Sequence, residues 1–242
     1  MPLDPTQWLR PDWPGTTAFM TTRGPNFGLR AGDPEQVRAN RAGLAGLLGA
    51  RPIFLDQVHG AHVVRLRAGW HDDNAPQADA AVSTDPDLAV AILVADCLPV
   101  LFAAPGGVAG AHAGWRGLAA GVLENTVAEL CAAAGCEPRD LQAWLGACIG
   151  PAAFEVGAEV VQAFGREPLA HDQPGFLYRP NPEPRWRADL ALLARERLQG
   201  AGVTEISGGG WCTLTDDSRF FSFRGEALGR PRGRMVACIS LR

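Results

Sequence analysis

Three residues that can bind a metal ion stand near the ends of apolar segments in this chain. His59 ends the segment IFLDQVHG, Cys97 ends LAVAILVADC, and His112 ends GGVAGAH. Such segments predict buried strands, and strand ends that point the same way bring their side chains together across a sheet. Two imidazoles and one thiolate suit a borderline-soft ion such as zinc, and three protein ligands leave a fourth position for water or substrate. The pattern predicts a catalytic metal site.

The same residues allow other interpretations. Copper could occupy the site, although a blue copper centre with a trinuclear cluster needs more histidines than the five present. In a metal-free hydrolase, Cys97 would be the nucleophile and His112 or His59 the base. A structural metal clip is less favoured, because closed sites usually have four protein ligands. Asp96 or Asp79 could move protons during catalysis, and Asp79 could instead fix a turn.

Several polar residues could supply substrate or phosphate contacts. Arg116, in HAGWRG, lies just before a predicted helix, whose free backbone N–H groups attract anions. A guanidinium group can also bind phosphate through two hydrogen bonds. Arg23 follows a predicted strand, and Asn40 and Arg41 lie on an early predicted helix. Arg224, after FFSF, is a further candidate. Taken alone, each arginine is more often a surface ion-pair partner.

The elements that must position these residues alternate without a regular βαβ order. This order predicts an α+β fold in a single domain spanning residues 1–242. Helices are predicted over 33–49, 118–134, 154–164 and 189–199, and a proline-rich surface loop over 171–184. Strands are predicted over 16–22, 52–58, 62–66, 79–83, 88–95, 98–103, 108–112, 144–149, 220–223 and 235–239.

Composition excludes several classes of protein. The chain has 242 residues, 47% of them hydrophobic and 20% charged, which is typical of a globular protein. A net charge of −4 without a basic run argues against nucleic-acid binding. The most apolar region, 88–115, is interrupted by Asp96, Pro99 and Pro105, so no membrane helix is expected. The N-terminus has no signal-peptide pattern, and the six cysteines form no CxxC motif. We therefore expect a cytoplasmic protein with reduced thiols.

The motifs taken together resemble one family, the YfiH/laccase-domain proteins, variously called polyphenol oxidases and purine nucleoside phosphorylases. The resemblance runs from about Arg23 to the C-terminus. It implies metal ligands at His59, Cys97 and His112, and a mixed β-sandwich flanked by helices in α/β/β/α layers, similar to a toxin-related Cys/His hydrolase fold. The matching stretches are TTRG, Asn40-Arg41, QVHG, ADAAVST, VADCLPVLF, HAGWRGLAAGVLENTV, IGPAAFEVG, Asp189-Leu190, Cys212-Thr213 and FFSFRGE.

The resemblance also implies an activity. Such a protein would use zinc to cleave adenosine, inosine and methylthioadenosine with phosphate, giving the free base and ribose-1-phosphate, and would deaminate some adenosine. The partners would be a purine nucleoside and phosphate, and the protein a monomer or small homo-oligomer. The older family name implies a copper-dependent polyphenol oxidase instead. Two segments depart from the family pattern: the short loop GPNFGLRAGDP, with Arg30 near the usual histidine, and Ala152-Ala153-Phe154 in place of Cys-Cys-Tyr.

Overall fold

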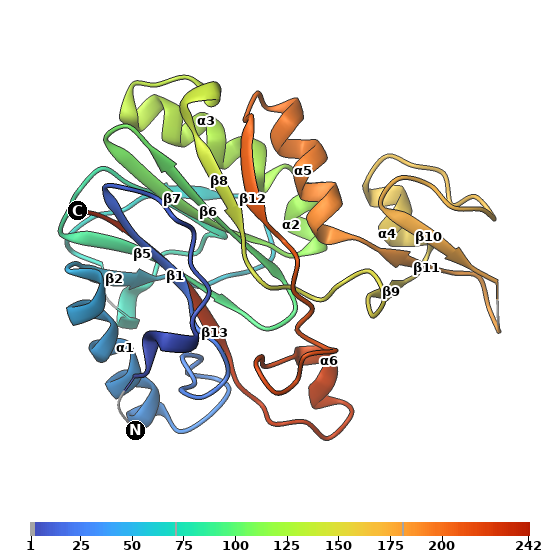
Figure 1. Cartoon of the computed structure of the whole chain (residues 1–242), viewed down its shortest axis with the longest axis horizontal. Coiled ribbons are helices and arrows are strands. Elements are labelled where there is room, and N and C mark those ends of the chain that lie inside the picture. Colours follow the sequence, from blue (N-terminus) through green and yellow to red (C-terminus); the bar gives the residue numbers. More distant parts are fainter. Residues whose placement is uncertain (1–2, 71, 181) are drawn as a thin grey trace.

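Two β-sheets stack face to face, and helices cover their outer faces (Figure 1). The computed structural model describes residues 3–70, 72–180 and 182–242. One sheet has the strand order β1 (Thr16–Met20), β13 (Met235–Leu241), β5 (Leu88–Val94), β2 (Arg51–Phe54). The other has the order β12 (Glu205–Gly208), β8 (Gln142–Leu145), β6 (Leu98–Ala104), β7 (Gly107–Ala113), β4 (Ala80–Ser83), β3 (Val63–Arg65).

The core between the sheets follows the two-residue period of the strands. In β5, Val90 and Ile92 point toward the second sheet, whereas Ala89 and Ala91 point toward the opposite face. Both faces are apolar because both are covered, which explains why the sequence shows continuous apolar runs rather than alternation. Gly110 in β7 lets the sheets approach: a Cβ there would lie 2.9 Å from Val90 Cγ1 and 3.0 Å from Ile92 Cγ1.

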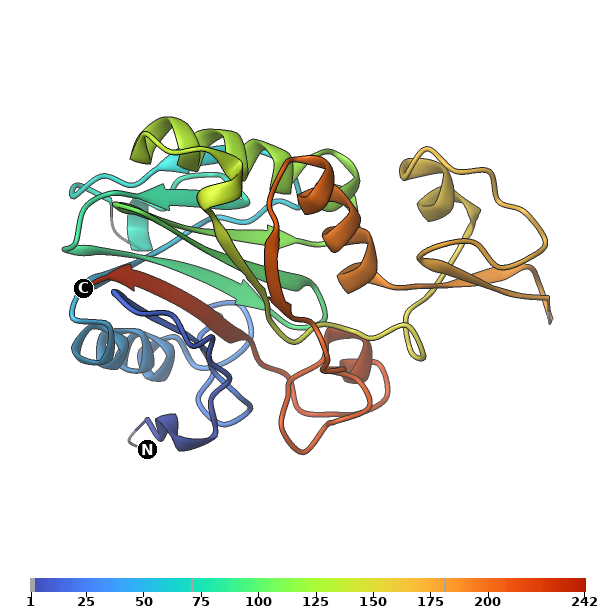
Figure 2. The same ribbon diagram turned by 45° about the horizontal axis from the view of Figure 1, so that its top comes forward.

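The outer layers are helical. Helix α1 (Pro34–Leu48) begins after Asp33, whose side chain accepts a hydrogen bond from the Glu35 N–H, and ends at the left-handed Gly49. It packs Leu44 and Leu48 against the four-stranded sheet. Helices α3 (Val122–Ala134) and α5 (Leu190–Gly200) cover the six-stranded sheet (Figure 2). The predicted α+β class and the α/β/β/α layers are therefore confirmed.

Several predicted boundaries are wrong. The helix predicted over 118–134 is divided into α2 (Trp115–Ala119) and α3, because Gly121 takes a left-handed φ of 91°. The segment predicted as a strand over 220–223 leads into α6 (Phe223–Glu226), which is capped by the Ser222 hydroxyl. Strand β12 was not predicted. The short 3₁₀ helices are η1 (Pro5–Gln7), η2 (Asp72–Asn74) and η3 (Pro138–Asp140).

A third, smaller sheet projects from the side of the sandwich (Figures 1 and 2). Its strand order is β10 (Phe176–Arg179), β11 (Arg185–Ala188), β9 (Glu155–Val156), and α4 (Ala158–Ala163) packs beside it. The helix predicted over 154–164 therefore begins as a strand. The loop predicted over 171–184 contains β10, which pairs antiparallel with β11, and the rings of Tyr178 and Trp186 are in contact across this pair. Within the described ranges, no helix has the length and apolar character needed to cross a membrane.

The different surroundings of Gly110 and Gly46 predict opposite effects when each is replaced by alanine. Gly110→Ala should lower the free energy of unfolding by about 1–3 kcal/mol, because the added methyl group overpacks the space between the sheets. Gly46→Ala, at an exposed position of helix α1 with open space around it, should raise that free energy by about 0.5–1 kcal/mol. Urea unfolding of both variants measures the difference. Equal stabilities would contradict the packing described here.

Candidate metal centre

The three predicted ligands lie where the chain crosses between the two large sheets. His59 is in the loop from β2 to β3, and Cys97 is in the loop from β5 to β6; both loops pass from the four-stranded to the six-stranded sheet. His112 lies in β7, opposite Pro99 of β6. The prediction that His59 ends a strand is wrong, because β2 stops at Phe54. The crossing loops nevertheless bring all three side chains to one edge of the sandwich.

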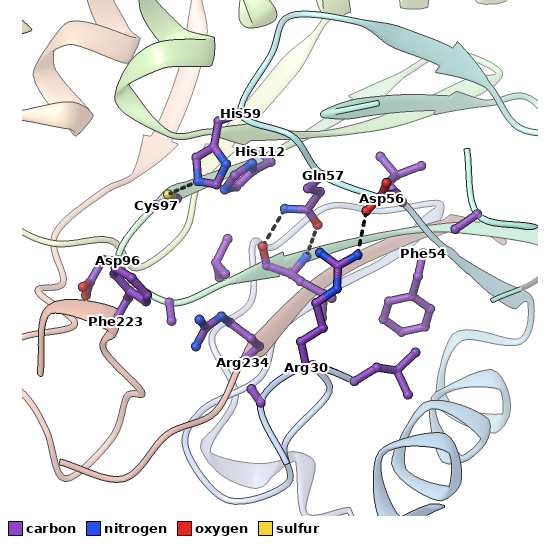
Figure 3. Close-up of a pocket in the computed structure, with 18 of the residues that line it drawn as sticks. Arg30, Phe54, Asp56, Gln57, His59, Asp96, Cys97, His112, Phe223 and Arg234 are labelled. Carbon is purple, nitrogen blue, oxygen red and sulfur yellow. Dashed lines mark hydrogen bonds and ion pairs between the residues drawn. The ribbon is translucent and has the colours of Figure 1, made fainter. Parts of the chain in front are cut away.

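The geometry of the three side chains fits a metal ion. One ligand atom from each residue lies within 4.8 Å of the others. Cys97 Sγ is 3.8 Å from His59 Nε2, and the two imidazole rings meet nearly edge to face (Figure 3). In a tetrahedral zinc site, bonds of about 2.0 Å to nitrogen and 2.3 Å to sulfur separate these atoms by roughly 3.5 Å. His112 is buried and His59 exposed, so the group is open on one side.

A buried carboxylate holds two of these residues in place. Asp79, which is 0% exposed, accepts hydrogen bonds from the backbone N–H groups of Val58 (3.2 Å), His59 (2.8 Å) and Gly60 (2.7 Å). Its Oδ1 is also 2.8 Å from His112 Nδ1, which leaves Nε2 of that ring as the ligand atom. These bonds fix the loop in which His59 adopts a left-handed φ of 62°. Asp79 therefore fixes the turn.

Electrostatics favour a charged thiolate beside the histidines. Burial alone would raise the pKa of Cys97, but the charge of His112 and hydrogen bonds from both histidines lower it to about 6. Burial alone would lower the pKa of His112, whereas the Cys97 thiolate and Asp79 raise it to about 9. Burial would also raise the pKa of Asp79, but its bonds to His112 and the backbone lower it. Both shifts favour the charged forms, a Cys97 thiolate and a His112 imidazolium, when no metal is bound near neutral pH.

A cavity of about 750 Å³ opens in front of the three residues. This volume lies within the range of pockets that bind small organic molecules. Its wall combines cationic and aromatic side chains from distant segments of the chain (Figure 3). The arginines are Arg30, Arg41, Arg116, Arg224, Arg232 and Arg234, and the aromatic residues are Phe54, Trp115, Phe154 and Phe223. Such a wall can hold an anion and a planar ring together.

Two of the predicted contact residues line this cavity. Arg41 is buried, donates from Nε to the Phe27 carbonyl at 3.0 Å, and lies over the Phe54 ring at 3.7 Å from its centroid. Arg116 is exposed, and its guanidinium lies 4.3 Å from the centroid of the Trp115 ring. A flat aromatic support orients the guanidinium plane of each arginine. The exposed Arg116 is therefore placed to meet an anion, and the buried Arg41 adds positive charge to the wall.

The other two predicted contact residues lie outside the cavity wall. Arg23 donates from Nη1 to the Asp217 carbonyl at 2.5 Å. Asn40, on α1, donates to the Asn26 carbonyl at 2.8 Å and is buried. Each bond connects the side chain to a neighbouring loop, and the role of both residues as substrate contacts stays a prediction. Arg224, the further candidate, does line the cavity.

The side chain of Asp96, a predicted catalytic residue, is fully engaged in hydrogen bonds. Its carboxylate accepts from Thr213 Oγ1 at 2.5 Å, Ser222 Oγ at 3.0 Å and the Arg224 N–H at 2.6 Å. Asp96 itself has a left-handed φ of 85° and is 8% exposed. It ties the segment 213–224 to the loop that carries Cys97.

Several residues of the cavity wall were not predicted from the sequence. Arg232 and Arg234 both pair with Glu226, and Phe223 lies beside them. A signal was present in the segment GRPRGR at 229–234, which places an arginine at every second position. Arg30 forms an ion pair with Asp56 at 3.7 Å across the mouth of the cavity (Figure 3). It lies in the segment GPNFGLRAGDP, between β1 and α1.

Comparisons with known proteins agree with this architecture. A family model described as multi-copper polyphenol oxidoreductase laccase matches residues 17–242. The chain therefore belongs to this family, the YfiH-type laccase-domain proteins.

Curated relatives in the family are named as nucleoside enzymes. The chain is 45% identical to purine nucleoside phosphorylase PA4543 of Pseudomonas aeruginosa, over 90% of this chain and 92% of the relative. It is 42% identical to purine nucleoside phosphorylase YfiH of Escherichia coli, over 96% of this chain and 97% of the relative. The crystal structure of protein NMB0706 from Neisseria meningitidis superimposes with a TM-score of 0.83 at 36% identity, covering 98% of this chain and 99% of that one.

The position of Asp79 predicts a loss of metal affinity in one variant. In Asp79→Asn, an amide NH₂ group would face backbone N–H donors, and the negative charge beside His112 would be lost. We expect the affinity for Zn²⁺, measured by competition with a chromophoric chelator, to fall by about 10–100-fold. Asp87→Asn, in an exposed turn before β5, is the matched control and should bind like the wild type. Equal affinities in both variants would refute the supporting role of Asp79.

The lowered pKa of Cys97 predicts its alkylation profile. Because the thiolate is the reactive form, iodoacetamide should modify Cys97 in metal-free protein with a midpoint at about pH 6. The rate should fall below this pH as the thiol becomes protonated. Mass spectrometry of the Cys97 peptide measures the modification, with Cys97→Ser as the control for other sites. A midpoint near the ordinary value of about 8.5 would contradict the described electrostatics. Fast alkylation with metal present would instead favour the metal-free hydrolase.

Proposed function

We propose that this protein is a zinc-dependent purine nucleoside phosphorylase. It cleaves adenosine, inosine and methylthioadenosine with phosphate to the free base and ribose-1-phosphate, and it deaminates adenosine. The observation that supports this proposal most strongly is the single cavity that joins the His59, Cys97 and His112 group to a wall of arginines and aromatic rings. The names of the relatives from Pseudomonas aeruginosa and Escherichia coli support the same reaction.

The donor set fits zinc. His59 Nε2, Cys97 Sγ and His112 Nε2 would hold the ion, and the bond from Asp79 to His112 Nδ1 gives that ring the tautomer needed for binding. A bound zinc ion acts as a Lewis acid that stabilises negative charge on oxygen. Copper also binds such ligands tightly, so the donor set alone does not distinguish the two metals.

Phosphorolysis requires phosphate to be held against the sugar. An oxygen of phosphate attacks the anomeric carbon, the bond from that carbon to the base nitrogen breaks, and its electron pair leaves with the base. Arg116 and Arg41, both in the cavity wall, are the groups we assign to phosphate, since guanidinium pairs it in a bidentate manner and fixes its direction. Arg23 and Asn40 support the bordering loops. Proton transfer by Asp96 remains a prediction.

The test is incubation of zinc-loaded protein with adenosine and phosphate. We expect adenine and ribose-1-phosphate, together with some inosine from deamination. Absence of both ribose-1-phosphate and inosine would remove the proposal.

A single arginine variant tests the phosphate site. Arg116→Gln should raise the KM for phosphate by about tenfold or more and change the KM for adenosine much less, because one charged hydrogen-bonding group is lost. Arg139→Gln is the matched control, because Arg139 is exposed in η3 and lies outside the cavity wall. A phosphate KM that is equal in the two variants would exclude Arg116 from the site.

A copper-dependent polyphenol oxidase is the second candidate, since the family description carries that activity. Within residues 3–70, 72–180 and 182–242, the side chains of His59, Cys97 and His112 form the one group of His, Cys, Asp or Glu with metal-binding spacing. That supports one metal ion rather than several. Stoichiometric copper and a blue absorption band in protein purified without added copper would favour oxidation.

The cysteines support a proposal about the cellular compartment. All six are free thiols, which supports a reducing compartment, the cytoplasm.

A further inference from the structure

One large aromatic side chain of the cavity wall is held open to solvent. Phe223 is 62% exposed, whereas the other two phenylalanines of the wall, Phe54 and Phe154, are 4% and 8% exposed. Exposed apolar surface is unfavourable in water, and a planar ring that remains uncovered at a cavity gains most when a second flat ring stacks on it. The Arg234 guanidinium lies 5.5 Å from the centroid of the Phe223 ring, so a cation already flanks it.

The backbone on both sides of Phe223 is fixed. The Ser222 hydroxyl donates to Asp96 Oδ2 at 3.0 Å and accepts from the Gly225 N–H at 3.0 Å, while the Arg224 N–H donates to the same Asp96 oxygen at 2.6 Å. Asp96 directly precedes Cys97 in the chain. The backbone that carries the ring is therefore fixed relative to the loop of Cys97 through a single buried carboxylate. Because this backbone is already ordered, it loses little conformational entropy when a ligand binds.

We propose that Phe223 is the platform on which the purine base of the substrate stacks, and that Asp96 is the positioning residue that holds this platform at a set place relative to Cys97. This inference rests on the proposed nucleoside phosphorylase function. Every purine has the same π-face, so stacking binds the base without reading its exocyclic groups. Such a platform would accept both the adenine and the hypoxanthine base of the proposed substrates, whereas hydrogen bonds to the 6-position would discriminate between them.

The test compares Phe223 with an equally exposed neighbour. Leu228, 66% exposed on the same segment, is not part of the cavity wall, so Leu228→Ala controls for loss of apolar surface alone. We expect Phe223→Leu to raise the KM for adenosine and for inosine by about tenfold. The KM for phosphate should stay unchanged, and Phe223→Trp should retain the wild-type nucleoside KM. An unchanged nucleoside KM in Phe223→Leu, or an equal rise in both KM values, would overturn the inference.

The positioning role of Asp96 is tested through its partner. Ser222→Ala removes one bond to Asp96, so we expect a rise of about threefold or more in the nucleoside KM at unchanged phosphate KM, with Ser222→Thr restoring it. Ser218→Ala is the control, because the exposed Ser218 hydroxyl donates to Asp216 Oδ1 and not to Asp96. A Ser222→Ala variant with the wild-type nucleoside KM would overturn the positioning role.

Calorimetric titration of adenosine separates this inference from the proposed function. If wild-type protein binds adenosine but neither cleaves nor deaminates it, the proposed function fails, and weaker binding by Phe223→Leu still supports the platform. If the wild type turns over adenosine and Phe223→Leu binds it equally well, the function stands and the platform is wrong. If the wild type binds no purine nucleoside, both are overturned.

Discussion

The buried carboxylate of Asp79 is the interaction on which the metal-binding group depends. A charged group without solvent contact is costly unless its oxygens are satisfied. Three consecutive backbone N–H groups and the His112 ring satisfy this one. The same bonds hold the β2–β3 loop against the start of β4, so the charge that needs partners also creates the turn that presents His59. The same hydrogen bonds therefore stabilise the loop and set the geometry of the site.

The site exists because the chain changes sheets at this edge. Strands β2 and β5 leave the four-stranded sheet here, and the loops that follow carry His59 and Cys97 to β7 of the other sheet. Helix α2 packs closely against the loops that carry His59 and Cys97, and this close packing requires glycine at two positions. A Cβ at Gly117 would lie 2.5 Å from the Gly60 carbonyl oxygen, and one at Gly114 would lie 3.0 Å from Cys97 Sγ. The apolar layers on either side supply the rigidity that a preorganised site needs.

Some features of the fold and of the site could be predicted from local sequence patterns, and others could not. The capped helix after Asp33 and the apolar strands β5 and β6 could be predicted because their signals lie within a few residues. The meeting of His59, Cys97 and His112 was predicted from polar residues at the ends of buried segments. The roles of Arg23 and Asn40 as loop supports could not be predicted, since their partners Asp217 and Asn26 are set by tertiary packing. The contribution of Phe223 to the wall depends on the anchoring of Ser222 and Arg224 by Asp96, which has no local signature.

The central claim is that two imidazoles and one thiolate from three separate segments bind a single metal ion with one position left open. X-ray absorption spectroscopy of the zinc-loaded protein tests it most directly. We predict one zinc ion per chain with one sulfur at about 2.3 Å and three light-atom ligands at about 2.0–2.1 Å, two of them with the scattering signature of imidazole. A coordination shell without sulfur, a shell with two or more sulfurs, or the absence of stoichiometric zinc binding would contradict the account.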